Sequence, residues 1–222
     1  MLINDYHDHK LGVDNEYTKP GRPLVTGAVR PGSVKLVLKW GYALHLTLLC
    51  CLDSAPMRLW VLANTLLTYL YSVHLKPLTG VKNVVCAAIV AMAVALGAIA
   101  TGAGGAALAS VWRPAVAVGG LIWHREIVMD IKDMAGDALA GVRTLPVAFG
   151  APRALLLSLV PLAGGACAAA SSGAPVAATL PLLLQGGCAL RAWSQGFAPA
   201  PMKLAIELAP AWLLWSLIVL TK

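Results

Sequence analysis

Charged side chains are scarce in this sequence. Asp, Glu, Lys and Arg make up only 12% of its 222 residues, hydrophobic residues make up 59%, and the mean hydropathy is +0.75. An average soluble domain carries about 25% charged residues, so a water-soluble fold of this composition would expose large apolar patches. The composition therefore excludes an ordinary soluble enzyme. It predicts a helical membrane protein that crosses the bilayer several times and forms a single domain over residues 1–222.

Several signatures of known functional sites are absent as well. The sequence contains no GxGxxG stretch, no Walker-type phosphate loop and no nucleophile elbow, and its five cysteines lie in apolar segments without metal-ligand spacing. Residues 1–30 lack the apolar run of a signal peptide. A net charge of +7 would suggest nucleic acid as a partner of a soluble protein. Here the basic residues lie between apolar runs, which indicates orientation in a lipid bilayer and no nucleic-acid partner.

Long apolar runs dominate the sequence. A transmembrane helix needs about 20 residues, with about 17 as a lower limit, and lipid leaves helix as the only suitable structure for such runs. The small residues of "LGAIATGAGGAALA" at 96–109 favour close packing between helices. We expect seven spans, at residues 33–52, 57–73, 82–101, 106–128, 152–170, 175–192 and 203–221.

The basic residues are distributed unevenly between the two sides of the predicted bundle. If the chain changes sides at each span, one side receives residues 1–35 and the loops 74–82, 125–153 and 191–203. This side carries 13 of the 17 Lys and Arg residues. Such an excess is typical of the cytoplasmic side, or of the stromal or matrix side in an organelle.

Two acidic clusters fall on that same side. The first lies in "NDYHDHKLGVD" at residues 4–14, and the second lies in "REIVMDIKDMAGD" at residues 125–137, where Glu126 extends the acidic face. Both clusters have the three- and four-residue spacing of one helical face. Ionisable groups at the edge of a bilayer are costly and usually functional. The candidate residues are Asn4, Asp5 and Asp8 in the first cluster and Asp130, Asp133 and Asp137 in the second.

Facing carboxylate clusters suit Mg²⁺, which takes oxygen ligands and bridges them to substrate phosphates. The same side offers basic residues for an anion such as diphosphate, and a prenyl tail would fit between apolar helices. These phosphate contacts are Arg22, Lys76, Lys82, Arg125 and Arg143. Two alternatives remain, namely acids that only anchor helix ends and a cation-coupled transporter.

Three stretches of the chain, "NDYHDHKLGVD…KPGRPLVTG", "YSVHLKPLTGVKN" and "REIVMDIKDMAGDALAGVRTLPVAFG", resemble the UbiA superfamily of intramembrane prenyltransferases. The resemblance covers essentially the whole chain. It implies an all-α fold of nine transmembrane helices around a central cavity. The seven runs would then be helices 3–9, and the chain would lack the first helix and most of the second.

The resemblance also implies roles for individual residues. Asn4, Asp5, Asp8, Asp130, Asp133 and Asp137 would bind Mg²⁺ and the prenyl diphosphate, with the five aspartates as catalytic groups. Arg22, Lys76, Lys82, Asn83 and Arg143 would lie near the diphosphate. Gly12 departs from the pattern, because many relatives carry an acid there, and Asp14 follows two residues later.

From these observations we expect an integral, multi-pass membrane enzyme whose active face lies on the cytoplasmic (or stromal or matrix) side. It would transfer a prenyl group to an aromatic or quinone-precursor acceptor, because a soft ring carbon needs no dedicated strong base. The alternative acceptor is a hydroxyl or carboxyl group, as in a glycerol phosphate or a chlorophyllide.

Overall fold

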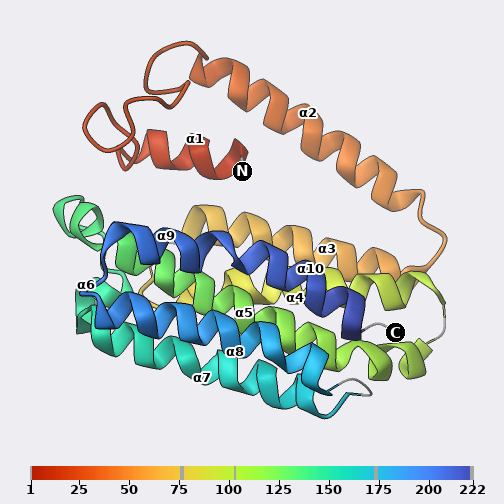
Figure 1. Cartoon of the computed structure of the whole chain (residues 1–222). Coiled ribbons are helices and arrows are strands. Elements are labelled where there is room, and N and C mark those ends of the chain that lie inside the picture. The colour runs from red at the N-terminus through yellow and green to blue at the C-terminus, as the bar shows by residue number, and fades with distance from the viewer. Residues whose placement is uncertain (1, 76–77, 103, 173–174, 221–222) are drawn as a thin grey trace. The chain divides into compact units, whose positions relative to one another are not determined.

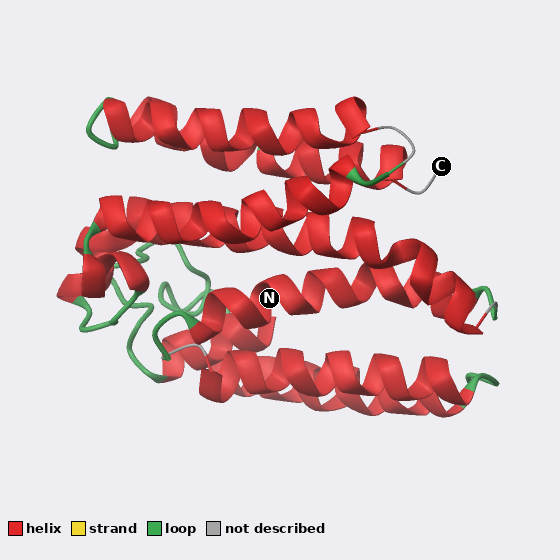
Figure 2. Ribbon diagram, turned by 90° about the horizontal axis from the view of Figure 1, so that it is seen from below, coloured by secondary structure: helices red, strands yellow, loops and turns green. Residues whose placement is uncertain are grey.

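The computed structural model describes residues 2–75, 78–102, 104–172 and 175–220, and all regular structure within them is helical (Figures 1 and 2). The all-α fold class is therefore confirmed. The chain divides into two compact units, residues 1–76 and 77–222, which are described separately. The single domain stays a prediction.

The first unit consists of three helices and a short π-helical turn. They are α1 (Leu2–Lys10), α2 (Pro31–Cys50), α3 (Ala55–Leu70) and η1 (Tyr71–Leu75). Proline stands in the first turn of α2 and α3, where its missing N–H is no loss. A hydrogen bond of 2.9 Å between His45 Nε2 and Thr65 Oγ1 links α2 to α3.

The second unit is built around the long helix α5, which packs most extensively against α4 and α7 (Figure 1). Three further helices, α8, α9 and α10, complete the unit, and α6 is a short helix before α7. The bounds are α4 (Val81–Ala100), α5 (Gly104–Leu139), α6 (Leu145–Phe149), α7 (Ala151–Ala170), α8 (Pro175–Ser194), α9 (Pro199–Glu207) and α10 (Ala209–Leu220).

Helix α5 is longer than the sequence predicted. We expected a span at 106–128 and a loop at 125–153, but the helix continues for 36 residues to Leu139. At 1.5 Å per residue this is about 54 Å, well beyond the thickness of a bilayer core. The chain leaves the helical conformation near Gly141, whose φ is +70°. The second acidic cluster therefore stands on a regular helix.

Three helical segments within the described residues are long and apolar enough to cross a membrane: α4, α7 and the combined segment Pro199–Leu220. The other four predicted spans are also helical, as α2, α3, α5 and α8, but are not among these three segments. Helix α3, for example, has only 16 residues. The count of seven spans and their correspondence to helices 3–9 stay predictions.

Helices α5 and α7 approach each other closely where glycines face the neighbouring backbone. A Cβ atom built on Gly120 would lie 2.2 Å from the carbonyl oxygen of Pro161, and one on Gly165 would lie 3.1 Å from the Cα of Ala117. Small residues allow backbones to meet in this way. The close packing expected at residues 96–109 was wrong for Gly97 and Gly105, since neither has an atom of a neighbouring element within 4 Å of its Cβ position.

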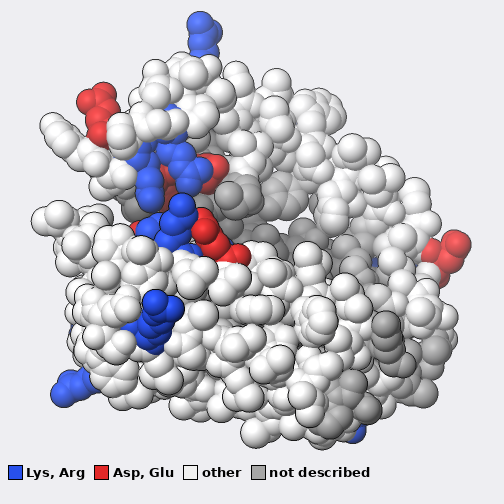
Figure 3. Space-filling view, viewed as in Figure 1, with Lys and Arg blue, Asp and Glu red and all other residues white. Residues whose placement is uncertain are grey.

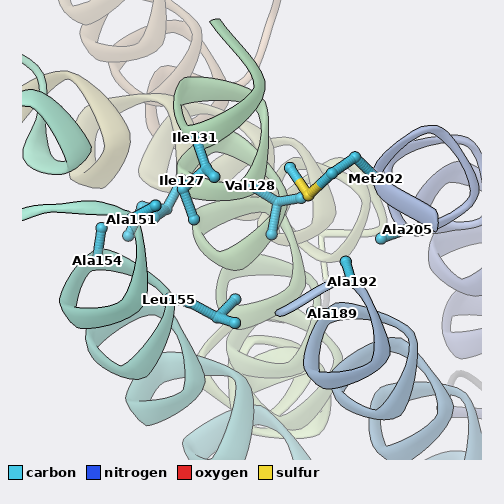
Figure 4. Close-up of a cluster of buried hydrophobic side chains, with 10 residues drawn as sticks. All are labelled: Ile127, Val128, Ile131, Ala151, Ala154, Leu155, Ala189, Ala192, Met202 and Ala205. Carbon is cyan, nitrogen blue, oxygen red and sulfur yellow. The ribbon is translucent and has the colours of Figure 1, made fainter. Parts of the chain in front are cut away.

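Three apolar clusters form the core of the second unit within the described residues, and two of them join α5 to α7 and α8. Figure 4 shows the cluster in which side chains of α5, α7, α8 and α9 point into the space between the helices, among them Val128, Leu155 and Ala189. The other cluster lies one to two turns away along the same helices and includes Leu121 and Leu182. The core thus holds α5 in place along most of its length.

The glycine contact between α5 and α7 can be tested by substitution. Gly120→Ala should lower the apparent melting temperature in detergent by several degrees, because overpacking costs about 1–3 kcal/mol. Gly164→Ala is the matched control, since nothing lies within 4 Å of its Cβ position. That control should be neutral or stabilising, because alanine is the better helix former. Equal melting temperatures for the two variants would contradict the close contact.

Candidate active site

The second acidic cluster begins with a buried carboxylate that two residues of α4 bind. Asp130 on α5 is 7% exposed. Its Oδ1 accepts a hydrogen bond from Lys82 Nζ at 2.6 Å, and its Oδ2 accepts one from Asn83 Nδ2 at 2.9 Å. A charge-assisted pair of this length is among the stronger protein interactions. Lys82 and Asn83, predicted as diphosphate contacts, therefore contact the acid itself.

The turn before α4 places these two residues. Gly80 precedes the helix with a φ of +76°, a conformation that favours glycine. Helix α4 begins at the next residue, so Lys82 and Asn83 lie in its first turn, next to α5. Asn83 is only 1% exposed, and its Oδ1 has no hydrogen-bond partner within the described residues. This burial suits a residue that orients Asp130.

The other two acids of this cluster are more accessible. Asp133 is exposed and Asp137 is half-buried. Burial raises the pKa of Asp137 above its usual value; nearby Lys82 opposes this shift, and the charges of Asp130 and Asp133 add to it. A cluster with this mutual repulsion favours a cation as its partner.

Arg125 and Glu126 stand one helical turn before Asp130. Arg125 NH1 donates a hydrogen bond of 2.9 Å to Glu126 Oε1, and both side chains are largely buried. Arg125, predicted to bind substrate, is thus paired with its neighbour. Arg143 lies beyond α5 with an exposed side chain, and its backbone carbonyl accepts a hydrogen bond from Thr79 Oγ1.

The first acidic cluster lies in the other unit, on α1. Asn4 Nδ2 donates a hydrogen bond of 2.9 Å to Asp8 Oδ2, as expected for residues four apart on one helical face. Asp8 is 7% exposed, and its backbone carbonyl accepts hydrogen bonds from the N–H groups of Val13 and Asp14. Lys76, the remaining predicted contact, lies outside the described residues.

Arg22 joins this cluster and brings in Asp14, an acid to which the sequence pattern gave no role. Its NH1 lies 3.1 Å from Asp5 Oδ1, and its Nε lies 3.8 Å from Asp14 Oδ2. The three residues line a small pocket of about 150 Å³ within the first unit. Asp14 is 6% exposed. Many relatives carry an acid at the position of Gly12, and Asp14 follows two residues later. This proximity was the signal in the sequence that could have identified Asp14 as a site residue.

Magnesium fits the chemistry of these side chains. The candidates offer carboxylate and amide oxygens, the ligands that Mg²⁺ prefers, and a carboxylate such as Asp130 can accept more than the two hydrogen bonds it has. The buried Oδ1 of Asn83 is a further acceptor beside it. Within the described residues no three His, Cys, Asp or Glu side chains are grouped closely enough to hold a metal ion, so the magnesium site stays a proposal.

An apolar groove of about 550 Å³ starts beside the turn that leads into α4. Thr79 and Gly80 lie at this turn, and Val84, Trp123 and Val160 extend the lining along α4, α5 and α7. Trp123 precedes Asp130 by two helical turns on α5. On the face drawn in Figure 3 most of the surface is uncharged, and the charged side chains gather mainly towards one end. Such a groove can accommodate a hydrocarbon chain.

The ion pair between Lys82 and Asp130 predicts a stability difference. Lys82→Met should destabilise the protein by about 3–5 kcal/mol, because it leaves a buried carboxylate without its cation. Lys203→Met is the control, since Lys203 lies 3.7 Å from Glu207 and both side chains are more than 60% exposed. Thermal unfolding in detergent measures both variants, and similar melting temperatures would contradict the structural role of Lys82.

The chain matches the sequence pattern of the UbiA prenyltransferase family over residues 1–219. It is 31% identical to a digeranylgeranylglyceryl phosphate synthase of Methanopyrus kandleri over 159 residues, which are 71% of this chain and 55% of that protein. A protein of the same name from Halobacterium salinarum is 34% identical over 173 residues, 75% of this chain and 57% of that protein. The chain thus spans just over half the length of these relatives.

The fold is also similar to that of a solved structure, described as giving structural and mechanistic insights into the biosynthesis of digeranylgeranylglyceryl phosphate synthase in membranes. The TM-score is 0.71 at 19% identity, over 99% of this chain and 78% of that one. At this identity the likeness concerns the fold alone. The sequence match over residues 1–219, together with the identity to the Halobacterium protein, shows that the chain belongs to the UbiA prenyltransferase family.

Proposed function

We propose that this protein transfers a prenyl group from a prenyl diphosphate to the hydroxyl group of a glycerol phosphate lipid within the membrane. The observation that carries the proposal is the buried Asp130, held by Lys82 and Asn83 beside exposed Asp133, in the unit that contains the apolar groove. This combination suits a substrate with an anionic head and a hydrocarbon tail. The two relatives named as digeranylgeranylglyceryl phosphate synthases support the acceptor.

The reaction replaces one C–O bond by another. The bond between C1 of the prenyl chain and the diphosphate oxygen breaks, C1 bonds to the acceptor oxygen, and the hydroxyl proton passes to an oxygen of the released diphosphate. Magnesium, when bound, would neutralise charge that develops on the leaving group. Each acidic cluster offers residues that would hold such an ion: Asn4, Asp5 and Asp8 in the first unit, and Asp130, Asp133 and Asp137 in the second.

The protein's own side chains would assist in three ways. Lys82 and Arg143 would donate hydrogen bonds to diphosphate oxygens and so stabilise the departing anion. Asn83 would keep the carboxylate of Asp130 oriented. The apolar groove would hold the hydrocarbon chain and exclude water, which would otherwise capture the carbocation-like prenyl group.

The membrane setting follows from the family and from the three apolar helical segments of sufficient length. We assign the active face to the cytoplasmic or equivalent side, because 13 of the 17 Lys and Arg residues fall there in the predicted topology. The aromatic or quinone-precursor acceptor that we first expected has less support than the glycerol phosphate. Both acceptors can be offered to the protein in the same assay.

A direct assay uses membranes that contain this chain, geranylgeranyl diphosphate and Mg²⁺. With geranylgeranylglyceryl phosphate as acceptor, mass spectrometry should detect a doubly prenylated glycerol phosphate, together with released diphosphate. With 1,4-dihydroxy-2-naphthoate as acceptor, we expect no product. Chelation by EDTA should stop the reaction. A naphthoate product would overturn the acceptor, and the absence of prenyl transfer to either acceptor would overturn the enzymatic proposal.

Asp133→Ala tests the acidic cluster in the same assay. Asp133 is exposed, so its loss should leave the fold intact while it reduces product formation at least about 100-fold. Asp53→Ala is the matched control, because Asp53 is also exposed and belongs to neither cluster. Unchanged product formation by Asp133→Ala would contradict a role of this carboxylate in binding or catalysis.

A further inference from the structure

Polar side chains with no exposed surface interrupt the apolar core in the described part of residues 77–222, and three of them come from α5, α7 and α8. These three are His124 on α5, Ser158 on α7 and Gln185 on α8, and each has a relative exposure of 0%. None of them belongs to the acidic clusters, and the proposed reaction does not use them. Buried polar groups in an apolar interior are costly unless each donor and acceptor has a partner.

The three residues lie at the same level of the helix bundle. In the core cluster of Figure 4, α5, α7 and α8 contribute Val128, Leu155 and Ala189. In the other cluster they contribute Leu121, Leu162 and Leu182. On each helix, the polar residue lies three residues from the named member of one cluster and four residues from the named member of the other. His124, for example, lies four residues before Val128 and three residues after Leu121. The spacing therefore places His124, Ser158 and Gln185 at one level between these two clusters, and we call the three residues the polar layer.

Hydrogen bonds within the layer determine the tautomer of His124. Ser158 Oγ donates its proton to the backbone carbonyl of Leu155 at 2.6 Å. The contact of 2.9 Å between His124 Nδ1 and Ser158 Oγ then requires Nδ1 to be the donor. In a neutral imidazole the lone pair is consequently on Nε2. This buried atom has no hydrogen-bond partner among the described residues.

Gln185 has a matching unsatisfied acceptor. Its Nε2 donates a hydrogen bond of 2.6 Å to the backbone carbonyl of Ala205, which defines the orientation of the amide. Its Oε1 is buried without a partner in the described part of the chain. Ala205 lies in the last turn of α9, just before the interruption between α9 and α10. Gln185 thus ties α8 to the break in the last span.

We propose that the polar layer binds one water molecule, which donates a hydrogen bond to His124 Nε2 and another to Gln185 Oε1. Water is the simplest ligand with two donors, and buried waters typically satisfy groups of this kind. The network then joins α5, α7, α8 and α9. Within a bilayer, where lipid tails are as apolar as the core, such interhelical hydrogen bonds help to define helix register.

The first test determines the tautomer in the unmodified protein. Solid-state or solution NMR of ¹⁵N-histidine-labelled protein in membranes should show His124 as neutral, with a proton on Nδ1 and a hydrogen-bonded lone pair on Nε2. The signal is assigned by its absence from the His124→Phe spectrum. A proton on Nε2, or a doubly protonated ring at neutral pH, would overturn the proposal, since neither state can accept from water at Nε2.

The second test measures whether His124 and Gln185 share a partner. His124→Phe and Gln185→Leu should each lower the apparent melting temperature by several degrees, and the double variant should fall by clearly less than the sum. Gln195→Leu, at an exposed position on the loop after α8, is the control and should change little. Strictly additive shifts would overturn the shared water. If a single variant does not fold, the NMR test on the unmodified protein still decides.

Discussion

The contact between α5 and α7 at Gly120 and Gly165 is the constraint on which most of the second unit depends. Because no side chain separates the backbones there, this close contact favours one register of the two helices. One turn further along α5, this register brings His124 to Ser158. Two to three turns further, it leads to the packed cluster around Ile127 and then to Asp130. A helix of 36 residues without such a contact would have several ways to slide against its neighbours.

Buried carboxylates of this protein accept hydrogen bonds from neighbouring side chains. Asp130 is buried, yet α4 supplies a cation and an amide for its two oxygens, and on α1 the amide of Asn4 reaches Asp8. Three residues that the sequence predicted as substrate contacts therefore hold acids in position: Lys82 and Asn83 contact Asp130, and Arg22 contacts Asp5 and Asp14. Substrate binding at Lys82 would exchange one anionic partner for another.

The choice of acceptor rests on the relatives and not on the chemistry of the acidic clusters. A ring carbon and a hydroxyl oxygen can both attack the same prenyl diphosphate, so the acidic clusters are equally compatible with either. The preference for a glycerol phosphate comes from relatives that match about seven-tenths of the chain. The groove on α4, α5 and α7 is apolar over most of its lining and suits the hydrocarbon part of either acceptor.

Much of this protein could be predicted from its sequence. Apolar composition excludes a soluble fold, and the spacing of Asp130, Asp133 and Asp137 predicts one helical face, because both depend only on local properties of the chain. The length of α5, the partners of Lys82 and Asn83, the role of Asp14 and the polar layer at His124 were not predictable in this way. Each depends on which residues from distant segments meet. The helical period specifies the face of a helix on which a side chain lies, but only tertiary packing decides what stands opposite.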